Sequence, residues 1–182
     1  MPAEQRARFL SNVAQDARRL KRLVDRLLEM ARADVLDPTG GKTPAAPLIE
    51  NLANRYKDAG LLVGFAGDRS AAARIAPEVL EMVFTNLFDN SRQNGADHVE
   101  IKVERAGAEI SLLVADNGKG VSQANADKVF TPFFTTHRDQ GGTGLGLGIV
   151  RSLLKAYGGD IELLAGDKGA TFKLAIPAAL NS

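Results

Sequence analysis

Cysteine is absent from the 182-residue sequence, and so is any excess of charge of one sign. The lack of cysteine excludes disulfides and thiolate metal sites, and it is compatible with a reducing compartment such as the cytoplasm. The 23 Lys and Arg side chains are balanced by 22 Asp and Glu, which leaves a formal net charge of +1. A chain whose charges are balanced so evenly lacks the electrostatic footprint of a nucleic-acid-binding protein, and we therefore expect no nucleic-acid partner.

Long hydrophobic runs are also missing. No apolar stretch approaches the roughly twenty residues that a membrane-spanning helix needs, and the N-terminus lacks the apolar segment of a signal peptide. We therefore expect a soluble, cytoplasmic chain with no membrane contact of its own, and a membrane anchor upstream stays open if the chain is a fragment. With 45% apolar and 25% charged residues, a chain of this length can bury one core and carry one appendage.

The N-terminal segment has a helical pattern. Apolar residues recur at alternating steps of three and four, which predicts one amphipathic helix of about 50 Å over residues 2–34 that packs along other helices, as in a four-helix bundle. The apolar stripe consists of Leu10, Val13, Ala17, Leu20, Val24, Leu27 and Ala31. Eight basic and five acidic residues at helical spacing indicate a solvated face. We expect a homodimer or higher self-association through this helix.

Residues 37–44 contain two prolines and two glycines, which end the helix. We predict a helical segment over residues 1–36, a linker over 37–46 and a folded domain over 47–182. Helices and strands segregate within the domain, so we expect an α+β fold, a two-layer sandwich with the helices on one face of a mixed, mainly antiparallel sheet. The expected helices span 47–59, 77–94 and 149–157, and the expected strands span 61–65, 74–76, 99–103, 110–115, 160–164 and 171–176.

A glycine-rich segment, Gly142-Thr-Gly-Leu-Gly-Leu-Gly148, follows the phenylalanine-rich residues 130–136 and precedes the last predicted helix. Glycine lets the backbone approach an anion, and the start of a helix offers unpaired N–H groups, so the segment predicts a phosphate-binding loop. It lacks the Lys-Ser or Lys-Thr pair of a P-loop, and its spacing misses the dinucleotide fingerprint G-x-G-x-x-G. A third type of nucleotide site is needed.

Two further segments narrow the choice. Asn86-Leu-Phe-Asp-Asn90 lies in a helical pattern, and Asp116-Asn-Gly-Lys-Gly-Val121 ends an apolar strand. In this order, together with residues 130–136 and 142–148, they resemble the N, G1, F and G2 boxes of the histidine-kinase ATP-binding domain, whose superfamily includes gyrase, MutL and the heat-shock-90 chaperones. The resemblance covers roughly residues 47–177. It implies the Bergerat fold, ATP or ADP with Mg²⁺ as ligands, transfer of the γ-phosphoryl group to a histidine, and a response regulator receiver domain as partner in a two-component system.

Asn86 and Asn90 are four residues apart and therefore share one helix face. The resemblance implies that Asn90 contributes an amide oxygen to Mg²⁺, which prefers hard oxygen ligands; the alternative is a pair of ordinary surface amides. ATP-hydrolysing relatives and the related anti-sigma serine kinases resemble one another in having Glu at position 86. An amide cannot accept a proton from water near neutral pH, so Asn86 favours transfer to an imidazole over hydrolysis.

Asp116 ends a predicted strand, and its carboxylate can accept a hydrogen bond from the exocyclic amine of adenine. The alternative is a turn-forming Asp before Asn-Gly. Gly118 and Gly120 are expected to let the chain pass close beneath the base. The resemblance implies that Thr171 supports the Asp116 carboxylate through a water molecule.

Residues 135–143 are polar and lack apolar anchors, which predicts a lid over a triphosphate. His137 and Arg138 either contact the phosphates or belong to a solvated loop. His137 stands where similar sequences often carry Lys, and Gln93 where a basic residue is frequent. The remaining residues that the resemblance assigns to the nucleotide are Val121, Gly142, Thr143, Gly144, Leu145, Gly146 and Leu147.

Neither histidine has the setting of a phosphoacceptor. The family acceptor lies on a helix before an acidic residue, whereas His98 precedes a predicted strand and His137 lies in the predicted lid. Residues 1–34 instead resemble the second helix of the dimerisation and phosphotransfer hairpin, so we expect no autophosphorylation of this chain alone. The alternatives are an anti-sigma-type serine kinase or an ATPase of the same superfamily, and a helical dimerisation module whose nucleotide is only a structural ligand.

Overall fold

The computed structural model describes residues 24, 41–137, 142–166 and 168–179. Of the predicted N-terminal helix it describes Val24 alone, so that helix, the self-association expected from it and most of the predicted linker lie outside the described residues. Within the described residues, no helix combines the length and the apolar character needed to cross a bilayer.

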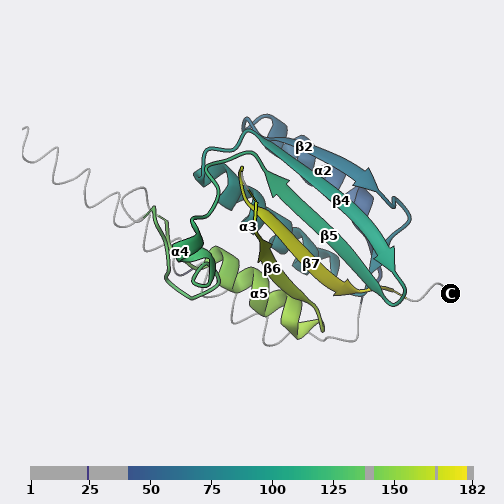
Figure 1. Ribbon diagram of the computed structural model, residues 1–182. Helices are drawn as coiled ribbons and strands as arrows, with labels where there is room; N and C mark the ends of the chain where they lie inside the picture. Colours follow the sequence, from purple (N-terminus) through teal and green to yellow (C-terminus); the bar gives the residue numbers. More distant parts are fainter. Residues whose placement is uncertain (1–23, 25–40, 138–141, 167, 180–182) are drawn as a thin grey trace, which may run out of the picture.

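A five-stranded sheet forms one layer of the domain, with the strand order β2-β4-β5-β7-β6 (Figure 1). All neighbouring strands run antiparallel except β2 and β4, which are parallel. The strands are β2 (Leu62–Gly67), β4 (His98–Ala106), β5 (Glu109–Asp116), β6 (Asp160–Leu164) and β7 (Thr171–Pro177). The expected mixed, mainly antiparallel sheet is confirmed.

Helices α2 (Ala45–Lys57), α3 (Pro77–Gln93) and α5 (Gly146–Ala156) form the second layer and cover one face of the sheet (Figure 1). Proline is the first residue of α3, where its missing N–H costs no hydrogen bond. Side chains alternate along β4 and β5 between exposed and buried positions, so one face of each strand packs against the helices. The predicted two-layer α+β sandwich is confirmed.

The inward face of β5 positions the candidate site. Ile110, Leu112 and Val114 point from it into the core, and Asp116 is the last residue in the same series. Asp116 is one of the few polar residues that are buried in the described part of the chain. A carboxylate at the end of an apolar series must find hydrogen-bond donors there, because burying it without them is costly.

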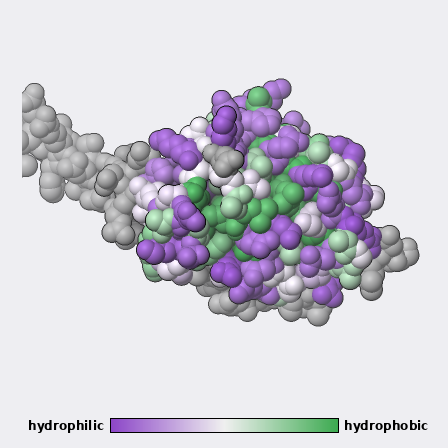
Figure 2. Space-filling model, viewed as in Figure 1, coloured by the Kyte–Doolittle hydropathy of each residue, from purple (hydrophilic) through white to green (hydrophobic). Residues whose placement is uncertain are grey.

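The face of the sheet that points away from the helices carries both charged and apolar side chains. Ion pairs join neighbouring outward residues, as between Lys173 and Glu162 on β7 and β6, at 3.2 Å. Leu113 and Ala175 on β5 and β7 are half-buried. In the view of Figure 1, hydrophobic residues gather over the middle of the molecule within a hydrophilic border (Figure 2).

Three local differences from the sequence prediction stand out. Thr43–Pro44 form a short strand, β1, although they fall in the predicted linker, and β1 pairs with β3 at Ala72–Ala73, two residues before the predicted strand. The Thr43 hydroxyl donates to the carbonyl of Ile75 at 2.5 Å, which ties the two segments together. The short helix α4, Gln123–Ala126, was not predicted because it lacks an apolar face.

Candidate nucleotide-binding site

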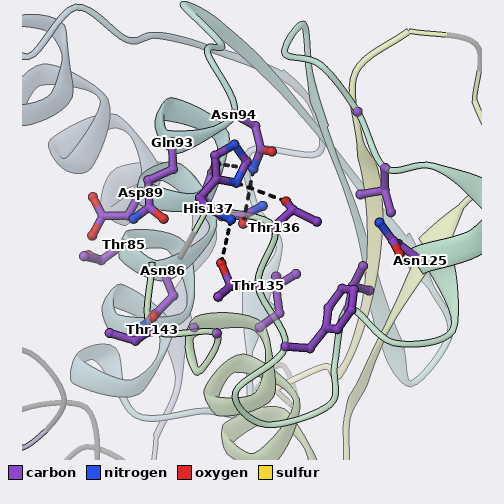
Figure 3. Close-up of a pocket in the computed structure, with 18 of the residues that line it drawn as sticks. Thr85, Asn86, Asp89, Gln93, Asn94, Asn125, Thr135, Thr136, His137 and Thr143 are labelled. Carbon is purple, nitrogen blue, oxygen red and sulfur yellow. Dashed lines mark hydrogen bonds between the residues drawn. The ribbon is translucent and has the colours of Figure 1, made fainter. Parts of the chain in front are cut away.

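A cavity of about 740 Å³ lies between α3, the segment after β5 and the loop that leads into α5. Figure 3 shows polar side chains of α3, among them Thr85 and Asn86, and the side chains of Thr135 and Thr143 around one space. Its size falls within the range of small-molecule sites. The N-box, part of the segment after Asp116 and the glycine-rich segment therefore meet at one cavity.

Asn86 and Asn90 both line this cavity from α3. Asn86 is buried, and its Nδ2 donates to the carbonyl of Met82 one turn earlier at 2.9 Å, which fixes the orientation of the amide. Its Oδ1 lies against the first turn of α5, where a Cβ on Gly146 would approach it to 3.3 Å. Glycine at position 146 thus allows the buried amide and the glycine-rich segment to lie in contact.

Asn94, the C-cap of α3, carries a third amide at the cavity, and the sequence prediction missed it. Its Nδ2 donates to the carbonyl of Asn90 at 2.8 Å and lies 3.5 Å from the Asn90 Oδ1. All three amides line the cavity at steps of four residues. Extending the spacing of Asn86 and Asn90 by one further turn would have identified Asn94.

The glycine-rich segment forms the opposite wall, with four of its residues lining the cavity: Thr143, Gly144, Gly146 and Leu147. Gly144 adopts a φ of +68°, and a Cβ there would lie 2.4 Å from the carbonyl carbon of Phe133. Phe133 itself has a φ of +66° and is more than half exposed. Only glycine fits at position 144, because both its backbone conformation and its neighbour exclude a side chain.

Three residues of the same segment, Gly142, Leu145 and Gly148, do not line the cavity. Leu145 is buried in the core and precedes α5, whose N-terminus receives no side-chain cap from the described residues. Gly142 closes the loop before it, because its N–H donates to the carbonyl of His137 at 3.0 Å. A Cβ at position 142 would lie 2.6 Å from the Thr135 hydroxyl, so this glycine also permits a close contact.

His137 lines the cavity, and Figure 3 shows its side chain near that of Thr136. Its backbone N–H donates to the Thr135 hydroxyl at 3.1 Å, and its Nδ1 lies 3.2 Å from the hydroxyl of Thr136. Arg138 and the middle of the predicted lid lie outside the described residues. The role of Arg138 therefore stays a prediction.

Asp116 accepts three hydrogen bonds through its carboxylate. Its Oδ1 receives the backbone N–H groups of Gly118 at 2.9 Å and Ala170 at 3.1 Å, and its Oδ2 receives the hydroxyl of Ser91 at 2.9 Å. Only 8% of the residue is exposed. The carboxylate is thus held from three separate segments of the chain, and it presents acceptor oxygens only.

Gly118, Gly120 and Val121 follow Asp116, and the latter two line the cavity. A Cβ on Gly118 would lie 2.9 Å from the carbonyl oxygen of Asn94. Gly120 has a φ of +72°, and a Cβ added there would lie 2.6 Å from the carbonyl oxygen of Gly169. Both glycines let this segment pack closely against neighbouring backbone. Asp116 and Gly118 lie next to the cavity lining in sequence and are not part of it.

Thr171 does not face Asp116. It pairs with Ala115 in the β5–β7 register, and Ala115 points away from the helices whereas Asp116 points toward them. Because side chains alternate along a strand, Thr171 belongs to the opposite face of the sheet. The hydroxyl beside Asp116 comes from Ser91, which the prediction missed although a serine interrupts the buried series Phe84, Leu87 and Phe88 on α3.

Tyr56 braces α3 from α2. Its hydroxyl donates to Asp89 Oδ1 at 2.9 Å, and its ring packs edge-on against Phe88 at a centroid distance of 5.2 Å. Burial raises the pKa of the Tyr56 hydroxyl well above its ordinary value, and the negative charge of Asp89 raises it further. Tyr56 therefore anchors α3, the helix that carries Asn86 and Asn90, to α2.

Residues 76–180 match the sequence profile of the family described as "Histidine kinase-, DNA gyrase B-, and HSP90-like ATPase". The sensor histidine kinase ZraS of Escherichia coli (strain K12) is 31% identical over 190 residues, which cover 99% of the chain and 40% of ZraS. The sensor protein SrrB of Staphylococcus aureus (strain NCTC 8325 / PS 47) is 29% identical over 181 residues, covering 92% of the chain and 31% of SrrB. The chain thus spans less than half the length of these relatives.

Solved structures share the fold. The Acinetobacter baumannii histidine kinase AdeS superposes with a TM-score of 0.72 at 22% identity, covering 97% of this chain and 86% of AdeS. Full-length ShkA in complex with AMPPNP gives a TM-score of 0.71 at 23% identity, covering the whole chain and 40% of ShkA. The family profile matches more than half of the sequence, and the chain therefore belongs to the histidine kinase-, DNA gyrase B- and HSP90-like ATPase family.

Proposed function

We propose that this chain is the ATP-binding catalytic domain of a sensor histidine kinase. The observation that carries the proposal is the cavity itself, where two N-box amides and the glycine-rich segment face each other beside a buried carboxylate. The resemblance of ZraS over almost the whole chain supports the same class. ShkA, with the same fold, was solved with the ATP analogue AMPPNP.

Asp116 selects the base. Two backbone N–H groups occupy its Oδ1, and the Ser91 hydroxyl occupies one acceptor position of Oδ2. The second lone pair of Oδ2 accepts the exocyclic amine of adenine. Guanine presents a carbonyl at the equivalent position, and two acceptors repel each other. We therefore expect ATP and ADP to bind in preference to GTP, and equal affinities in calorimetry would contradict base recognition by Asp116.

Asn90 would hold the magnesium ion that accompanies the phosphates. The residue lines the cavity, and an amide oxygen is a hard ligand of the kind that suits Mg²⁺. The ion would supply positive charge to neutralise the phosphate chain. The glycine-rich segment offers backbone N–H groups at the start of α5 to the same anion. His137, which lines the cavity, and Arg138, which lies outside the described residues, are the proposed cationic contacts of the phosphates.

Asn86 decides the type of reaction. Its amide donates to Met82 and has no basicity with which to take a proton from water. An imidazole needs no such base, because the ring nitrogen that attacks carries a free electron pair and no proton, whereas the oxygen of water must lose a proton. That pair forms the new P–N bond, the bond between the γ-phosphorus and the bridging oxygen breaks, and ADP leaves with the electrons of that bond. The other ring N–H then releases its proton to solvent.

The acceptor histidine comes from another segment. The chain contains two histidines, and neither lies on a helix: His98 begins β4, and His137 belongs to the loop at the cavity. We propose that the acceptor helix pairs with residues 1–36 in the full-length protein, and that residues 37–46 link this pair to the catalytic domain. The phosphoryl group then passes to a response regulator receiver domain, and the full-length protein dimerises through its helices. We place the catalytic domain in the cytoplasm, with any membrane anchor upstream.

Labelling with [γ-³²P]ATP tests the proposal. We expect the 182-residue chain to bind ATP without becoming labelled, and the full-length protein to carry acid-labile label on histidine. An Asn86→Glu variant of the same chain serves as a comparison, because it places a potential base at the site and should hydrolyse ATP faster than the wild type. Acid-stable label on serine or threonine would overturn the proposal in favour of a serine kinase, and rapid hydrolysis by the wild type would favour an ATPase.

A further inference from the structure

Ser91 is a buried polar residue on the core-facing side of α3. Only 2% of it is exposed, and its hydroxyl donates to Asp116 Oδ2 at 2.9 Å. A serine in a row of apolar core residues weakens helix packing unless its hydroxyl finds a partner. The Ser91 hydroxyl has such a partner in the Asp116 carboxylate, which we propose recognises the base.

The three bonds to Asp116 divide its two oxygens. Backbone N–H groups of Gly118 and Ala170 bind Oδ1, and they are present whatever the side chains at those positions. The bond to Oδ2 depends on one side chain, because Ser91 is the residue that supplies it among the described residues. Rotation of the carboxylate about its Cβ–Cγ bond would move both oxygens, and the Ser91 hydroxyl is the side-chain group that holds Oδ2, the oxygen proposed to meet the base.

Ser91 also follows Asn90 directly on α3, so the residue proposed to hold Mg²⁺ and the residue that fixes the carboxylate are neighbours on one helix. Because Thr171 lies on the other face of the sheet, the hydroxyl beside Asp116 among the described residues is that of Ser91. We infer that Ser91 is a positioning residue for base selection: it orients the Asp116 carboxylate so that one lone pair of Oδ2 points at the 6-position of the purine. The inference rests on the proposed function.

The test compares ATP with inosine triphosphate, which replaces the 6-amino group of adenine by a carbonyl and keeps the rest of the molecule. Affinities are measured by calorimetry for the wild-type chain and for Ser91→Ala. We expect the wild type to prefer ATP, and the variant to lose about tenfold in ATP affinity and much less in inosine triphosphate affinity, because the lost bond is charge-assisted. The preference for ATP therefore shrinks.

Thr43→Val is the matched control. It also removes a buried hydroxyl hydrogen bond, from Thr43 to the carbonyl of Ile75, at a place remote from Asp116 in the fold. We expect it to lower the melting temperature and to leave the ratio of the two affinities unchanged. Comparison of the two variants separates a loss of stability from a loss of base selection.

Each outcome is decisive. A wild type that binds neither triphosphate, or binds both equally, contradicts the proposed function itself. A wild type that prefers ATP, with Ser91→Ala keeping that preference, overturns the role of Ser91 and leaves the proposed function standing. Equal losses for both triphosphates in Ser91→Ala would likewise overturn it, because they would show a structural effect without base selection.

Discussion

The two ends of the cavity are built in different ways. At the proposed base end, which lies beside the cavity lining, one buried carboxylate is held by donors from α3, from the turn after β5 and from the residue before β7. At the phosphate end, the half-buried Asn90 and His137 line open space, and the backbone of the glycine-rich segment forms the wall. Fixed geometry concentrates at the end that we propose distinguishes between bases.

This difference follows from what each end must recognise. A base is chosen by the direction of one or two hydrogen bonds, so an acceptor that could rotate would lose discrimination. A phosphate chain presents many equivalent oxygens, and electrostatic attraction to N–H groups, cations and Mg²⁺ depends less on any single direction. Substitutions at the base end should therefore have larger effects on nucleotide affinity than substitutions at the phosphate end.

Asp116→Asn should produce the largest effect. The Asn oxygen can still accept the N–H groups of Gly118 and Ala170, so its amide group would stand where Oδ2 lies and meet the adenine amine donor to donor. Such a mismatch costs about 3 kcal/mol, or roughly a hundredfold in ATP affinity. Calorimetry measures the loss, and a thermal melt shows whether the fold is kept. Wild-type affinity in the variant would contradict the fixed base end.

Gly144→Ala should produce the next largest effect. An alanine at a φ of +68° is strained, and its Cβ would collide with the Phe133 carbonyl carbon at 2.4 Å. We expect a loss of stability of about 1 to 3 kcal/mol and roughly tenfold weaker ATP binding as the wall shifts.

Gly148→Ala is the control for this change. It lies two residues into α5, and its Cβ would make an ordinary contact at 3.4 Å with the carbonyl of Phe130. Alanine favours a helix by up to about 1 kcal/mol over glycine, so this variant should melt at the same or a higher temperature. If Gly144→Ala and Gly148→Ala had the same melting temperature and the same ATP affinity, the special conformation of Gly144 would have no role at the proposed phosphate end.

The sequence predicted most of the fold because its main elements are strongly periodic. The hairpin of β4 and β5 and the helix that begins at Pro77 were found close to their observed bounds. The prediction placed the short strand β3 two residues too late and missed its partner β1, since two-residue strands carry no period. Their pairing depends on long-range contacts such as Thr43 to Ile75, which a local pattern cannot show.

The candidate site was predicted less completely. Asn86 and Asn90 were found through the N-box pattern, with their spacing placing them on one helix face, and the structure places both at the cavity. Thr171 was assigned from a motif, but the alternation of β7 turns it to the other face of the sheet. Ser91 and the backbone N–H of Ala170 reach Asp116 only through the packing of α3 on the sheet, so sequence spacing could not connect them.

Asn90→Ala tests the phosphate end and should have a smaller effect. Removing the amide oxygen deletes one proposed ligand of Mg²⁺, and the ion keeps its phosphate and water ligands. We expect wild-type affinity for ATP in the presence of a chelator and several-fold weaker affinity with Mg²⁺. Gln93→Ala, also at the cavity and on α3, should leave the magnesium dependence unchanged. A much lower melting temperature of Asn90→Ala without ligand would instead identify Asn90 as structural.

Tyr56→Phe should have the smallest effect, and it probes the support shared by both ends. Tyr56 holds α3 through Asp89, and burial together with the Asp89 charge raises the pKa of its hydroxyl above the ordinary 10.0. The folded state therefore keeps the proton that the unfolded state loses, so this contribution is complete below pH 10.0 and declines as the pH rises above it. The wild-type melting temperature should fall more steeply above that pH than that of Tyr56→Phe, whose ring keeps the contact with Phe88. At neutral pH the loss of one hydrogen bond should cost about 1 kcal/mol and leave the preference for ATP intact, because Ser91 and Asp116 are untouched.

If the melting temperatures of the wild type and of Tyr56→Phe fell in parallel across the alkaline range, the Tyr56 hydroxyl would contribute nothing to the anchoring of α3.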